Sequence, residues 1–504
     1  MIYGKGTMQK LRDYQIKAIE DLRFHFARGK KRILLVSPTG SGKTVIACSM
    51  IKNTKANSKF SLFIAHRREL VMQCSSKLTD WEVSHGVIMA NKSPNMTADA
   101  QVGSIQTYTA RKDRDTFIKP HADVIFLDEA HRSVSNSFKK LIAEYPNAFF
   151  IGLTATPIRS DGKGLGDIYE ELVEAGNIKD LTQQGYLVKN KIVAPSIPDL
   201  QKIRLVMGDY DKKQLEQKMN TPKLVGDLVS HWMKFGEDRP TIVFATSIKH
   251  SKYICNIFNH NGIPAGHIDG EMKEIDREKV LKRLDKDEIK VLSNCMVLTE
   301  GWDQPKVSCI IIARPTKSYP MYIQMIGRTL RPYPNKKDTL IIDHAGCVYN
   351  HGFPEDAGNW SLTSTTRKEK EKITKEKVEK QPMTCTQCST VYKATKDDPS
   401  CPTCSHIPTK KEKIVLIAEG RLVELPKIRD HTKDKESFYA QLVFYGKQKG
   451  FKEGWASWTY KRKYGHFPHS KKVFPIATGK DVMNFIQHCN IRRAKSQNVR
   501  ELHI

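Results

Sequence analysis

The sequence predicts an α/β protein of two lobes, each built on a parallel β-sheet, followed by a four-cysteine module and a small basic C-terminal domain. The chain has 504 residues, and single hydrophobic cores stop growing at roughly 250–300 residues. Short apolar runs alternate with amphipathic helical stretches over residues 30–345. That alternation is typical of strand–helix–strand units in a parallel sheet. After residue 353 it gives way to charged and cysteine-containing segments.

Seven apolar runs are predicted to be buried strands, because strands covered by helices on both sides are apolar on both faces. They are RILLV (32–36), SLFIA (61–65), VIFL (124–127), FFIGL (149–153), TIVFA (241–245), VLS (291–293) and CIIIA (309–313). Residues 194–236, between the two sets, are less regular. We therefore predict lobe 1 over residues 1–193, a connection over 194–236 and lobe 2 over 237–352.

The composition favours a polyanionic partner. Lys and Arg number 83 against 55 Asp and Glu, a formal net charge of +28, and such an excess most simply serves a polyanion. A basic surface without a specific partner is the alternative. No run approaches the roughly 18–20 apolar residues of a membrane span, and the first fifteen residues lack the apolar stretch of a signal peptide. We therefore expect a cytoplasmic protein with reduced cysteines and no membrane partner.

A phosphate-binding loop is predicted at SPTGSGKT (37–44), between the strand 32–36 and a helical stretch that follows. Backbone N–H groups of such a loop and the N-terminus of the next helix bind anions. Lys43 would neutralise the β- and γ-phosphates, and the Thr44 hydroxyl would bind Mg²⁺. Ser37 stands where G-x-x-x-x-G-K-[ST] has its first glycine. The predicted contacts with ATP are Thr39, Gly40, Ser41, Gly42, Lys43 and Thr44.

Two adjacent carboxylates are predicted to complete the nucleotide site. DVIFLDEAH places Asp128 and Glu129 at the carboxyl end of a strand, the edge at which α/β sheets bind ligands. Asp128 would hold Mg²⁺ through water, and Glu129 would accept a proton from the attacking water. Their mutual repulsion requires a cation, which Mg²⁺·ATP would supply.

Positive charge for the transition state of phosphoryl transfer is predicted in QMIGRTLR (324–331). Arg328 and Arg331 are three residues apart in a helical pattern and would share one helix face. Both belong to the predicted lobe 2. A γ-phosphate bound between the lobes would draw them together, and hydrolysis would release them.

In chain order these segments resemble the motifs of superfamily 2 helicases, over about residues 10–350. The matching segments are LRDYQ (11–15), PTGSGKT (38–44), AHRREL (65–70), SIQTY (104–108), DEAH (128–131), TAT (154–156), FATS (244–247), LTEGWDQP (298–305) and QMIGRTLR. The resemblance implies two RecA-like lobes, ATP in the cleft and a nucleic-acid strand across both lobes. It implies that Arg12, Gln15, Gly301 and Asp303 face the nucleotide, with Gln15 at the base. It places Arg67, Gln106, Thr107 and Thr299 near the strand.

Within the superfamily, the chain is most similar to bacterial RadD-type proteins and phage branch-migration helicases. The similar segments are VLTEGWDQP, IIARPTKS, YIQMIGRTLRP, the cysteine cluster and GWASWTYKRKYGHFP. This implies an ATP-dependent DNA helicase or translocase that acts on forked or four-way DNA in recombination, repair or replication. DEAH together with HRREL favours DNA over RNA. An RNA helicase, a restriction-type translocase on duplex DNA and an ATP-switched clamp that does not unwind are the alternatives.

A four-thiolate metal site is predicted after a charged linker at 353–384. Cys385-x2-Cys388 and Cys401-x2-Cys404 are separated by twelve residues, a spacing typical of tetrahedral structural Zn²⁺. The predicted module covers residues 385–410. Cysteines without a metal are the alternative.

Residues 411–504 are predicted to be a basic, aromatic-rich nucleic-acid-binding region. IVLIAEGRLVEL (414–425) would form a hairpin turning at Glu419–Gly420. Residues 441–500 hold thirteen Lys and Arg against two Asp and Glu. Lys461, Arg462 and Lys463 are the predicted nucleic-acid contacts. The interleaved aromatic residues could stack on unpaired bases or form the core of a small domain.

Overall fold

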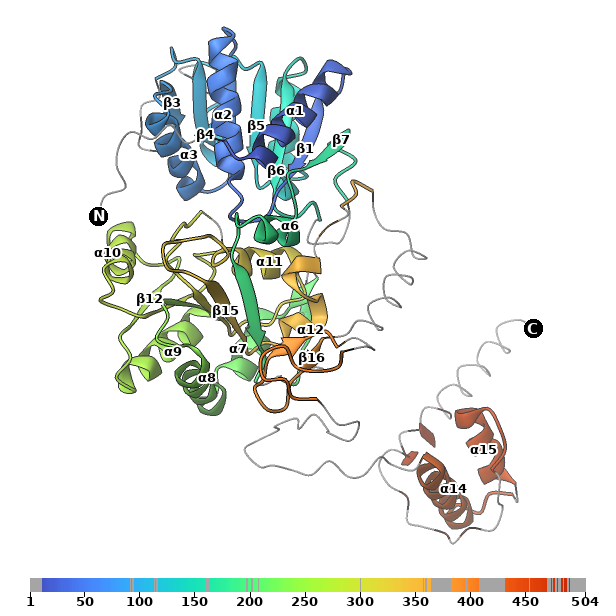
Figure 1. Ribbon diagram of the computed structural model, residues 1–504. Coiled ribbons are helices and arrows are strands. Elements are labelled where there is room, and N and C mark those ends of the chain that lie inside the picture. The colour runs from blue at the N-terminus through green and yellow to red at the C-terminus, as the bar shows by residue number, and fades with distance from the viewer. Residues whose placement is uncertain are drawn as a thin grey trace, which may run out of the picture. The chain divides into compact units, whose positions relative to one another are not determined.

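The computed structural model describes residues 11–407 and 431–489, with short gaps (Figure 1). The gaps are residues 91, 93–94, 113, 115–116, 159–163, 196–197, 201–202, 207, 300, 357, 359, 364–381, 395–397, 453, 469–472, 474, 476–477, 479–481, 484 and 487–488. The chain forms two compact units, residues 1–421 and 422–504. The predicted hairpin at 414–425 lies outside the described residues, as does most of the predicted linker.

Lobe 1 is a seven-stranded sheet in the order β3-β4-β2-β5-β6-β1-β7, with every pairing parallel. Separate apolar clusters lie on its two faces, one around α1, α2 and α3 and one around α4 and α5. The strands are β1 (Arg32–Val36), β2 (Ser61–Ala65), β3 (His85–Ile88), β4 (Ala100–Ser104), β5 (Val124–Asp128), β6 (Phe149–Thr154) and β7 (Glu171–Glu174). The helices are α1 (Asp13–Ala27), α2 (Lys43–Ala56), α3 (Arg68–Asp80), α4 (Ile105–Arg111), η1 (Ala130–Arg132) and α5 (Asn136–Glu144).

Lobe 2 is a six-stranded parallel sheet in the order β12-β13-β11-β14-β15-β8. Its strands are β8 (Lys189–Val193), β11 (Thr241–Phe244), β12 (Ala265–Ile268), β13 (Val291–Asn294), β14 (Cys309–Ile312) and β15 (Asp338–Asp343). Its helices are α6 (Ile178–Gln183), α7 (Lys212–Met219), α8 (Pro222–Phe235), α9 (Ile248–His260), α10 (Glu274–Asp285), α11 (Tyr319–Gly327), α12 (Cys347–His351) and η2 (Pro354–Asp356). A small antiparallel pair, β9 (Leu205–Val206) and β10 (Asp209–Tyr210), precedes α7.

All seven predicted strands are present, each within one residue of its predicted end. The lobe boundary differs from the predicted one. β8 ends at Val193 but pairs with β15 of lobe 2, and Ile178 and Leu181 of α6 belong to the lobe 2 core. The core of lobe 1 ends at Ala175, so residues 178–193 belong with lobe 2.

The first part of the predicted linker packs on the lobes. Trp360 N–H donates to Oε1 of Glu174 over 2.9 Å, and Gly166 N–H donates to the carbonyl of Leu362 over 3.0 Å. The Trp360 and Leu362 side chains pack against the cluster containing Tyr169 in lobe 1. Residues 360–362 therefore fasten the chain leaving lobe 2 to the surface of lobe 1.

The four-cysteine module begins with the antiparallel pair β16 (Met383–Thr384) and β17 (Val391–Tyr392). It extends the free edge of the lobe 2 sheet, since Thr390 forms a β-bridge with Val193 of β8. Val391 is buried in the lobe 2 core.

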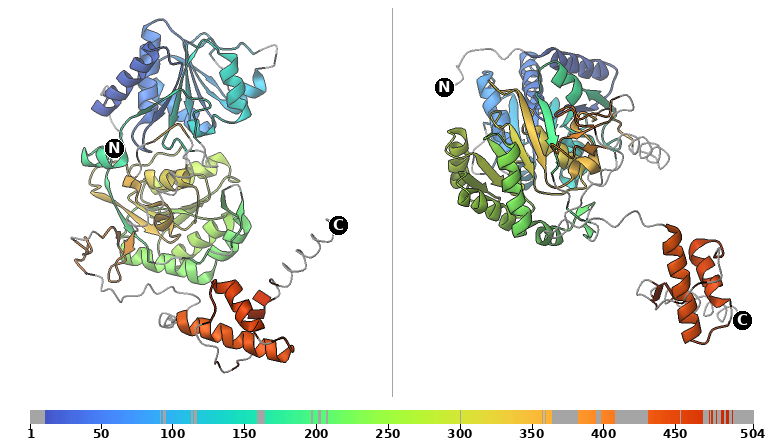
Figure 2. Two further views of the ribbon diagram at one scale, coloured as in Figure 1. Left: turned by 90° about the vertical axis from the view of Figure 1, so that its right-hand side faces the viewer. Right: turned by 60° about the horizontal axis from the view of Figure 1, so that its bottom comes forward.

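The second unit is built around α14 (His431–Gln448) and α15 (Trp455–Tyr464), which lie side by side in both views of Figure 2. Its core contains Phe438, Tyr439, Leu442, Tyr460, Val482 and Ile486. Among the described residues, we find no helix whose length and apolar character would let it cross a membrane.

Candidate nucleotide site and metal centre

The loop between β1 and α2 requires its two inner glycines. Gly40 has φ +89° and Gly42 has φ +87°, a backbone region that residues with a Cβ rarely adopt. A Cβ at Gly42 would lie 2.7 Å from Nε2 of Gln15, and one at Gly40 would lie 3.0 Å from Cγ of Arg331. α2 begins at Lys43, so the helix N-terminus follows the loop directly, as anion binding requires.

Ser37 contributes a hydrogen bond within the loop that a glycine could not make. Its hydroxyl is hydrogen-bonded to the hydroxyl of Ser41, and both side chains are buried. Ser41 Oγ also bonds to the carbonyl of Pro38 at 2.6 Å. Ser37, which replaces the usual first glycine, therefore links the start of the loop to Ser41 by a side-chain hydrogen bond.

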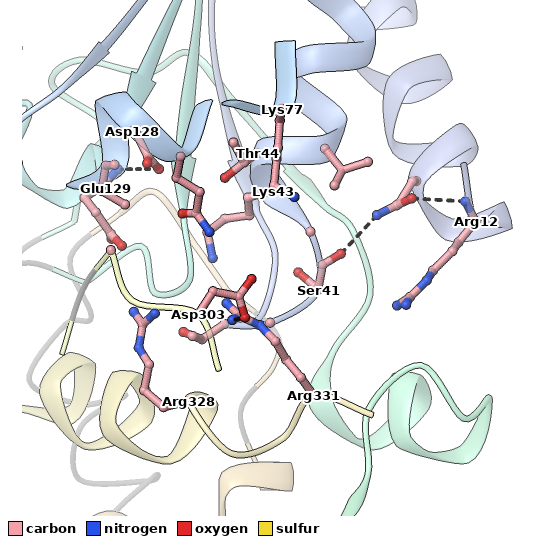
Figure 3. Close-up of a pocket in the computed structure, with 18 residues that line it drawn as sticks. Arg12, Ser41, Lys43, Thr44, Lys77, Asp128, Glu129, Asp303, Arg328 and Arg331 are labelled. Atoms are coloured by element: carbon pink, nitrogen blue, oxygen red, sulfur yellow. Dashed lines mark hydrogen bonds and ion pairs between the residues drawn. The ribbon is translucent and has the colours of Figure 1, made fainter. Parts of the chain in front are cut away.

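Lys43 lies against its own loop beside the acidic pair. Its Nζ donates to the carbonyls of Ser37 at 3.1 Å and Pro38 at 3.4 Å. Burial lowers the pKa of Lys43, while the carboxylates of Glu129 and Asp128 oppose that shift. The ammonium group is thus held between the loop and the carboxylates (Figure 3).

The acidic pair lies at the end of β5, the middle strand of the lobe 1 sheet. Glu129 adopts a left-handed conformation with φ +50°, and its N–H donates to Oδ1 of Asp128 over 3.0 Å. Oε2 of Glu129 lies 3.4 Å from Nδ1 of His131. Both residues are at least 94% buried. A left-handed backbone is strained for a residue that has a Cβ, and such strain often occurs at functional sites.

The two arginines of lobe 2 are held by the loop at 299–303. Arg328 donates to the carbonyl of Thr299 from Nε at 3.1 Å and Nη2 at 2.6 Å, and to that of Trp302 from Nη1 at 2.7 Å. Arg331 forms an ion pair with Asp303. Burial lowers the pKa of Arg331 to about 10, so it stays charged at neutral pH.

The predicted common helix face for these arginines is wrong. α11 ends at Gly327, Arg328 occupies the C-cap and Arg331 lies beyond the helix. Pro332 follows Arg331, and a residue before proline is disfavoured in helical conformation. A Cβ at Gly327 would lie 2.3 Å from Cβ of Thr39, so the end of α11 packs directly on the phosphate loop.

The N-terminus of α1 is fastened to the same loop. Gln15 Nε2 donates to the carbonyl of Ser41 over 3.1 Å, and its Oε1 accepts from the N–H of Arg12 over 3.0 Å. The Arg12 guanidinium lies 4.9 Å from the centre of the Tyr186 ring. Tyr14 also donates to the Ser41 carbonyl and stacks obliquely on Tyr186 at 5.1 Å.

One cavity of about 370 Å³ between the lobes is lined by all fourteen residues predicted for catalysis and nucleotide binding (Figure 3). They are Arg12, Gln15, Thr39, Gly40, Ser41, Gly42, Lys43, Thr44, Asp128, Glu129, Gly301, Asp303, Arg328 and Arg331. Sequence reasoning missed four lining residues, Val45, Leu70, Gln73 and Lys77. The last three lie three and four residues apart on α3 and so share one face of that helix.

The residues predicted to contact nucleic acid are only partly together. Gln106 is exposed and donates to the carbonyl of His66 over 2.8 Å, next to Arg67 at the N-cap of α3. Thr107 N–H donates to Ser104, the N-cap of α4. Thr299 is only 3% exposed and its hydroxyl donates to the carbonyl of Met296. The Thr299 carbonyl also accepts hydrogen bonds from Arg328, so this residue connects the predicted strand contact to the nucleotide site.

Two family models match the two lobes in order. "Type III restriction enzyme, res subunit" matches residues 8–159, and "Helicase conserved C-terminal domain" matches residues 222–333. A protein of Schizosaccharomyces pombe that carries the name of a mitochondrial ATP-dependent helicase, Irc3, is 33% identical over 66% of this chain and 57% of its own length. The chain belongs to the superfamily 2 helicases. It is an ATP-hydrolysing enzyme of that class, and the prediction of RecA-like lobes is confirmed.

A phage protein and a restriction-enzyme fragment are also similar to this helicase. A 51.5 kDa protein of a Lactococcus phage is 28% identical over 81% of this chain and 86% of its own. A fragment assigned to the HsdR subunit of a type I restriction enzyme from Vibrio vulnificus has a TM-score of 0.53 at 21% identity, covering 70% of this chain and 68% of that one. This helicase spans only about half the length of the yeast relatives it matches.

The four predicted metal ligands of the helicase are together. The Sγ atoms of Cys385, Cys388, Cys401 and Cys404 all lie within 4.8 Å of one another. Cys385 is 3.5 Å from Cys404, and Cys388 is 3.6 Å from Cys401. Zn–S bonds of about 2.3 Å in a tetrahedron give sulfur separations of roughly 3.8 Å, whereas a disulfide needs about 2.05 Å. The donor set therefore fits structural Zn²⁺.

We expect one zinc ion per chain, and its loss in Cys388→Ser. Elemental analysis of the purified helicase measures the content, and thermal unfolding measures the lowered melting temperature. Because the module packs on the edge strand β8, the loss should also loosen the edge of lobe 2. Cys489→Ser, in the other compact unit, is the matched control and should keep its zinc. Unchanged zinc content in Cys388→Ser would show that these thiols hold no metal.

Some aromatic residues of the C-terminal unit form its core, and others are exposed, where they could stack on bases. Tyr460 is buried in the core, with Trp455 and Tyr464 packed against it, whereas Trp458, Phe467 and Phe451 are exposed. Among the predicted basic contacts, Lys463 lies 3.6 Å from the Phe438 ring centre and Arg462 is exposed. Lys461 lies against the exposed rings of Trp458 and Phe467.

Proposed function

We propose that this helicase uses ATP hydrolysis to translocate on DNA and to unwind or branch-migrate forked or four-way junctions in recombination, repair or replication. The supporting observation is the single cavity that joins the phosphate loop and acidic pair of lobe 1 to the arginines of lobe 2. A site divided between two lobes couples hydrolysis to their relative motion.

The residues suggest how the site works with Mg²⁺·ATP, which supplies the γ-phosphate that is cleaved. The loop N–H groups and Lys43 would bind the phosphates, and Thr44 and Asp128 would hold Mg²⁺. Glu129 would orient the attacking water and accept its proton. Arg328 and Arg331 would place positive charge on the transferred group.

The contacts of the arginines suggest a route from the nucleotide to nucleic acid. Arg328 is bonded to the carbonyls of Thr299 and Trp302, and Arg331 is paired with Asp303. An arginine drawn toward a phosphate must release or pull on these partners. The loop at 299–303 would then move, and with it Thr299, the residue of this loop expected near the strand.

The net charge of +28 suits either nucleic acid, and one structural similarity favours DNA as the polymer. One restriction enzyme of similar fold, LlaBIII, has been solved bound to DNA, with a TM-score of 0.51 at 20% identity over 67% of this chain and 28% of that one. The same similarity supports the second candidate, translocation on duplex DNA without strand separation. The C-terminal unit would add a nucleic-acid grip and the zinc module structural support. An RNA helicase is the third candidate.

The rate of ATP hydrolysis should rise most with branched DNA. We would compare no nucleic acid, single-stranded DNA, duplex DNA, a four-way junction and RNA, with Glu129→Gln as the blank. A strand-displacement assay on the best substrate then separates unwinding from translocation on duplex. Stimulation by RNA alone would contradict the choice of DNA, and stimulation by none of them would indicate a switch activated by a partner.

A further inference from the structure

Trp458 is the most exposed tryptophan or phenylalanine in the described residues, with 61% of its surface open. Phe467 lies beside it, 43% exposed, with its ring perpendicular to the indole and 5.2 Å away between centres. Trp455, one turn earlier on the same helix, instead packs against Tyr445 and Phe451. Large aromatic side chains normally bury most of their surface, so the exposed pair requires an explanation.

The packing of α15 fixes Trp458 in this position. Ser457, Thr459 and Tyr460 are buried. Ser457 is hydrogen-bonded to the hydroxyl of Tyr439 on α14 at 2.8 Å, and Tyr460 contacts the Tyr439 ring edge-on at 5.6 Å between centres. Turning the helix to bury Trp458 would expose these residues and break the hydrogen bond. The exposed indole is therefore held on a rigid support.

A cation lies beside the exposed rings. Lys461 Nζ is 4.4 Å from the centre of Phe467 and 5.4 Å from the centre of Trp458. Arg462 is exposed one position further along the helix, four residues after Trp458 and so on the same side. Thirteen Lys and Arg against two Asp and Glu in residues 441–500 make an acidic polymer the complementary ligand.

We propose that Trp458, Phe467 and Lys461 form a stacking site for an unpaired base of a nucleic-acid strand. The indole supplies a flat surface that any base can stack on, and Lys461 and Arg462 supply charge for the adjoining phosphates. A double helix offers such a surface only at its ends, so the site is specific for single-stranded segments. This inference rests on the proposed function and adds to it the form of polymer that the C-terminal unit holds.

Equilibrium binding of the full-length protein to a labelled oligothymidylate, without ATP, tests the site. Trp458→Ala should bind roughly 5- to 150-fold more weakly, the effect of losing one stacked base, and Trp458→Phe should recover most of the affinity. Phe24→Ala is the matched control, because Phe24 is 55% exposed and lies 5.2 Å from the Arg28 guanidinium in the other compact unit. It should bind like the wild type.

An oligonucleotide of the same length without bases separates stacking from charge. Wild type and Trp458→Ala should bind it equally, whereas Lys461→Ala should weaken binding to both oligonucleotides and reduce the salt dependence by about one phosphate contact. Unchanged affinity of Trp458→Ala for the thymidylate, or an equal loss on the base-free strand, would overturn the proposal. So would a loss confined to blunt duplex ends. These equilibria do not depend on hydrolysis, so they stay informative if no nucleic acid stimulates the ATPase.

Discussion

Replacing Glu129 with Gln is expected to lower the rate of ATP hydrolysis by roughly 10²–10⁴-fold, the contribution of a general base. The amide keeps the size and most of the hydrogen bonds of the side chain but cannot accept the proton of the attacking water. Nucleotide affinity should be retained, since the carboxylate is assigned to the water and not to the phosphates. Turnover with saturating DNA and equilibrium binding of a fluorescent ATP analogue measure the two quantities.

Two further variants make this result specific. Lys43→Ala should also lose turnover, but through weaker nucleotide binding, while both variants keep their affinity for DNA. Glu170→Gln is the matched control, because Glu170 pairs with Arg32 at 2.7 Å and does not line the cavity. Normal hydrolysis in Glu129→Gln would remove the assigned base. A loss of nucleotide affinity in that variant would instead show that the carboxylate also helps to hold the nucleotide.

The strands that could be predicted were those whose side chains alone indicate burial. β3, β4 and β12 read HGVI, AQVGS and AGHI, and glycine weakens the strand signal. Their glycines are explained by packing that appears only in the fold. A Cβ at Gly103 would lie 3.1 Å from Cβ of Ile88, and one at Gly266 would lie 2.9 Å from Cγ1 of Val280. β8 begins KNK, so its first residues carry no apolar strand signal.

The nucleotide site was predictable because its residues lie in short segments with fixed spacing. The phosphate loop and the acidic pair could be predicted from such segments, since their chemistry depends on neighbours in sequence. Leu70, Gln73 and Lys77 could not, because the cavity-facing side of α3 depends on how that helix packs in lobe 1. The pairing of Arg331 with Asp303 and the division of the C-terminal aromatics between core and surface likewise depend on long-range contacts.

Arg331→Ala is expected to lower DNA-stimulated hydrolysis by roughly 10³–10⁵-fold, the usual effect of removing an arginine that stabilises phosphoryl transfer. The guanidinium lies in the cavity beside Gly40 of the loop, and its partner Asp303 would be left as an unpaired carboxylate. Arg331→Lys should recover little activity, because an ammonium group cannot reproduce the planar, two-pronged donor. Single-turnover hydrolysis with saturating DNA measures the chemical step directly.

Comparison with Arg328→Ala distinguishes charge on the phosphate from support of the loop at 299–303. Arg328 makes three hydrogen bonds to the carbonyls of Thr299 and Trp302, so its removal should lower thermal stability and DNA affinity as well as hydrolysis. Arg331→Ala should affect hydrolysis alone. Arg283→Ala, at an exposed lobe 2 position near Glu288, is the control for loss of a surface charge and should leave all three properties unchanged. Normal single-turnover rates in Arg331→Ala would leave Arg328 as the only arginine of this cavity that could serve the transition state from lobe 2. The chemical step and the movement of the 299–303 loop would then depend on one side chain.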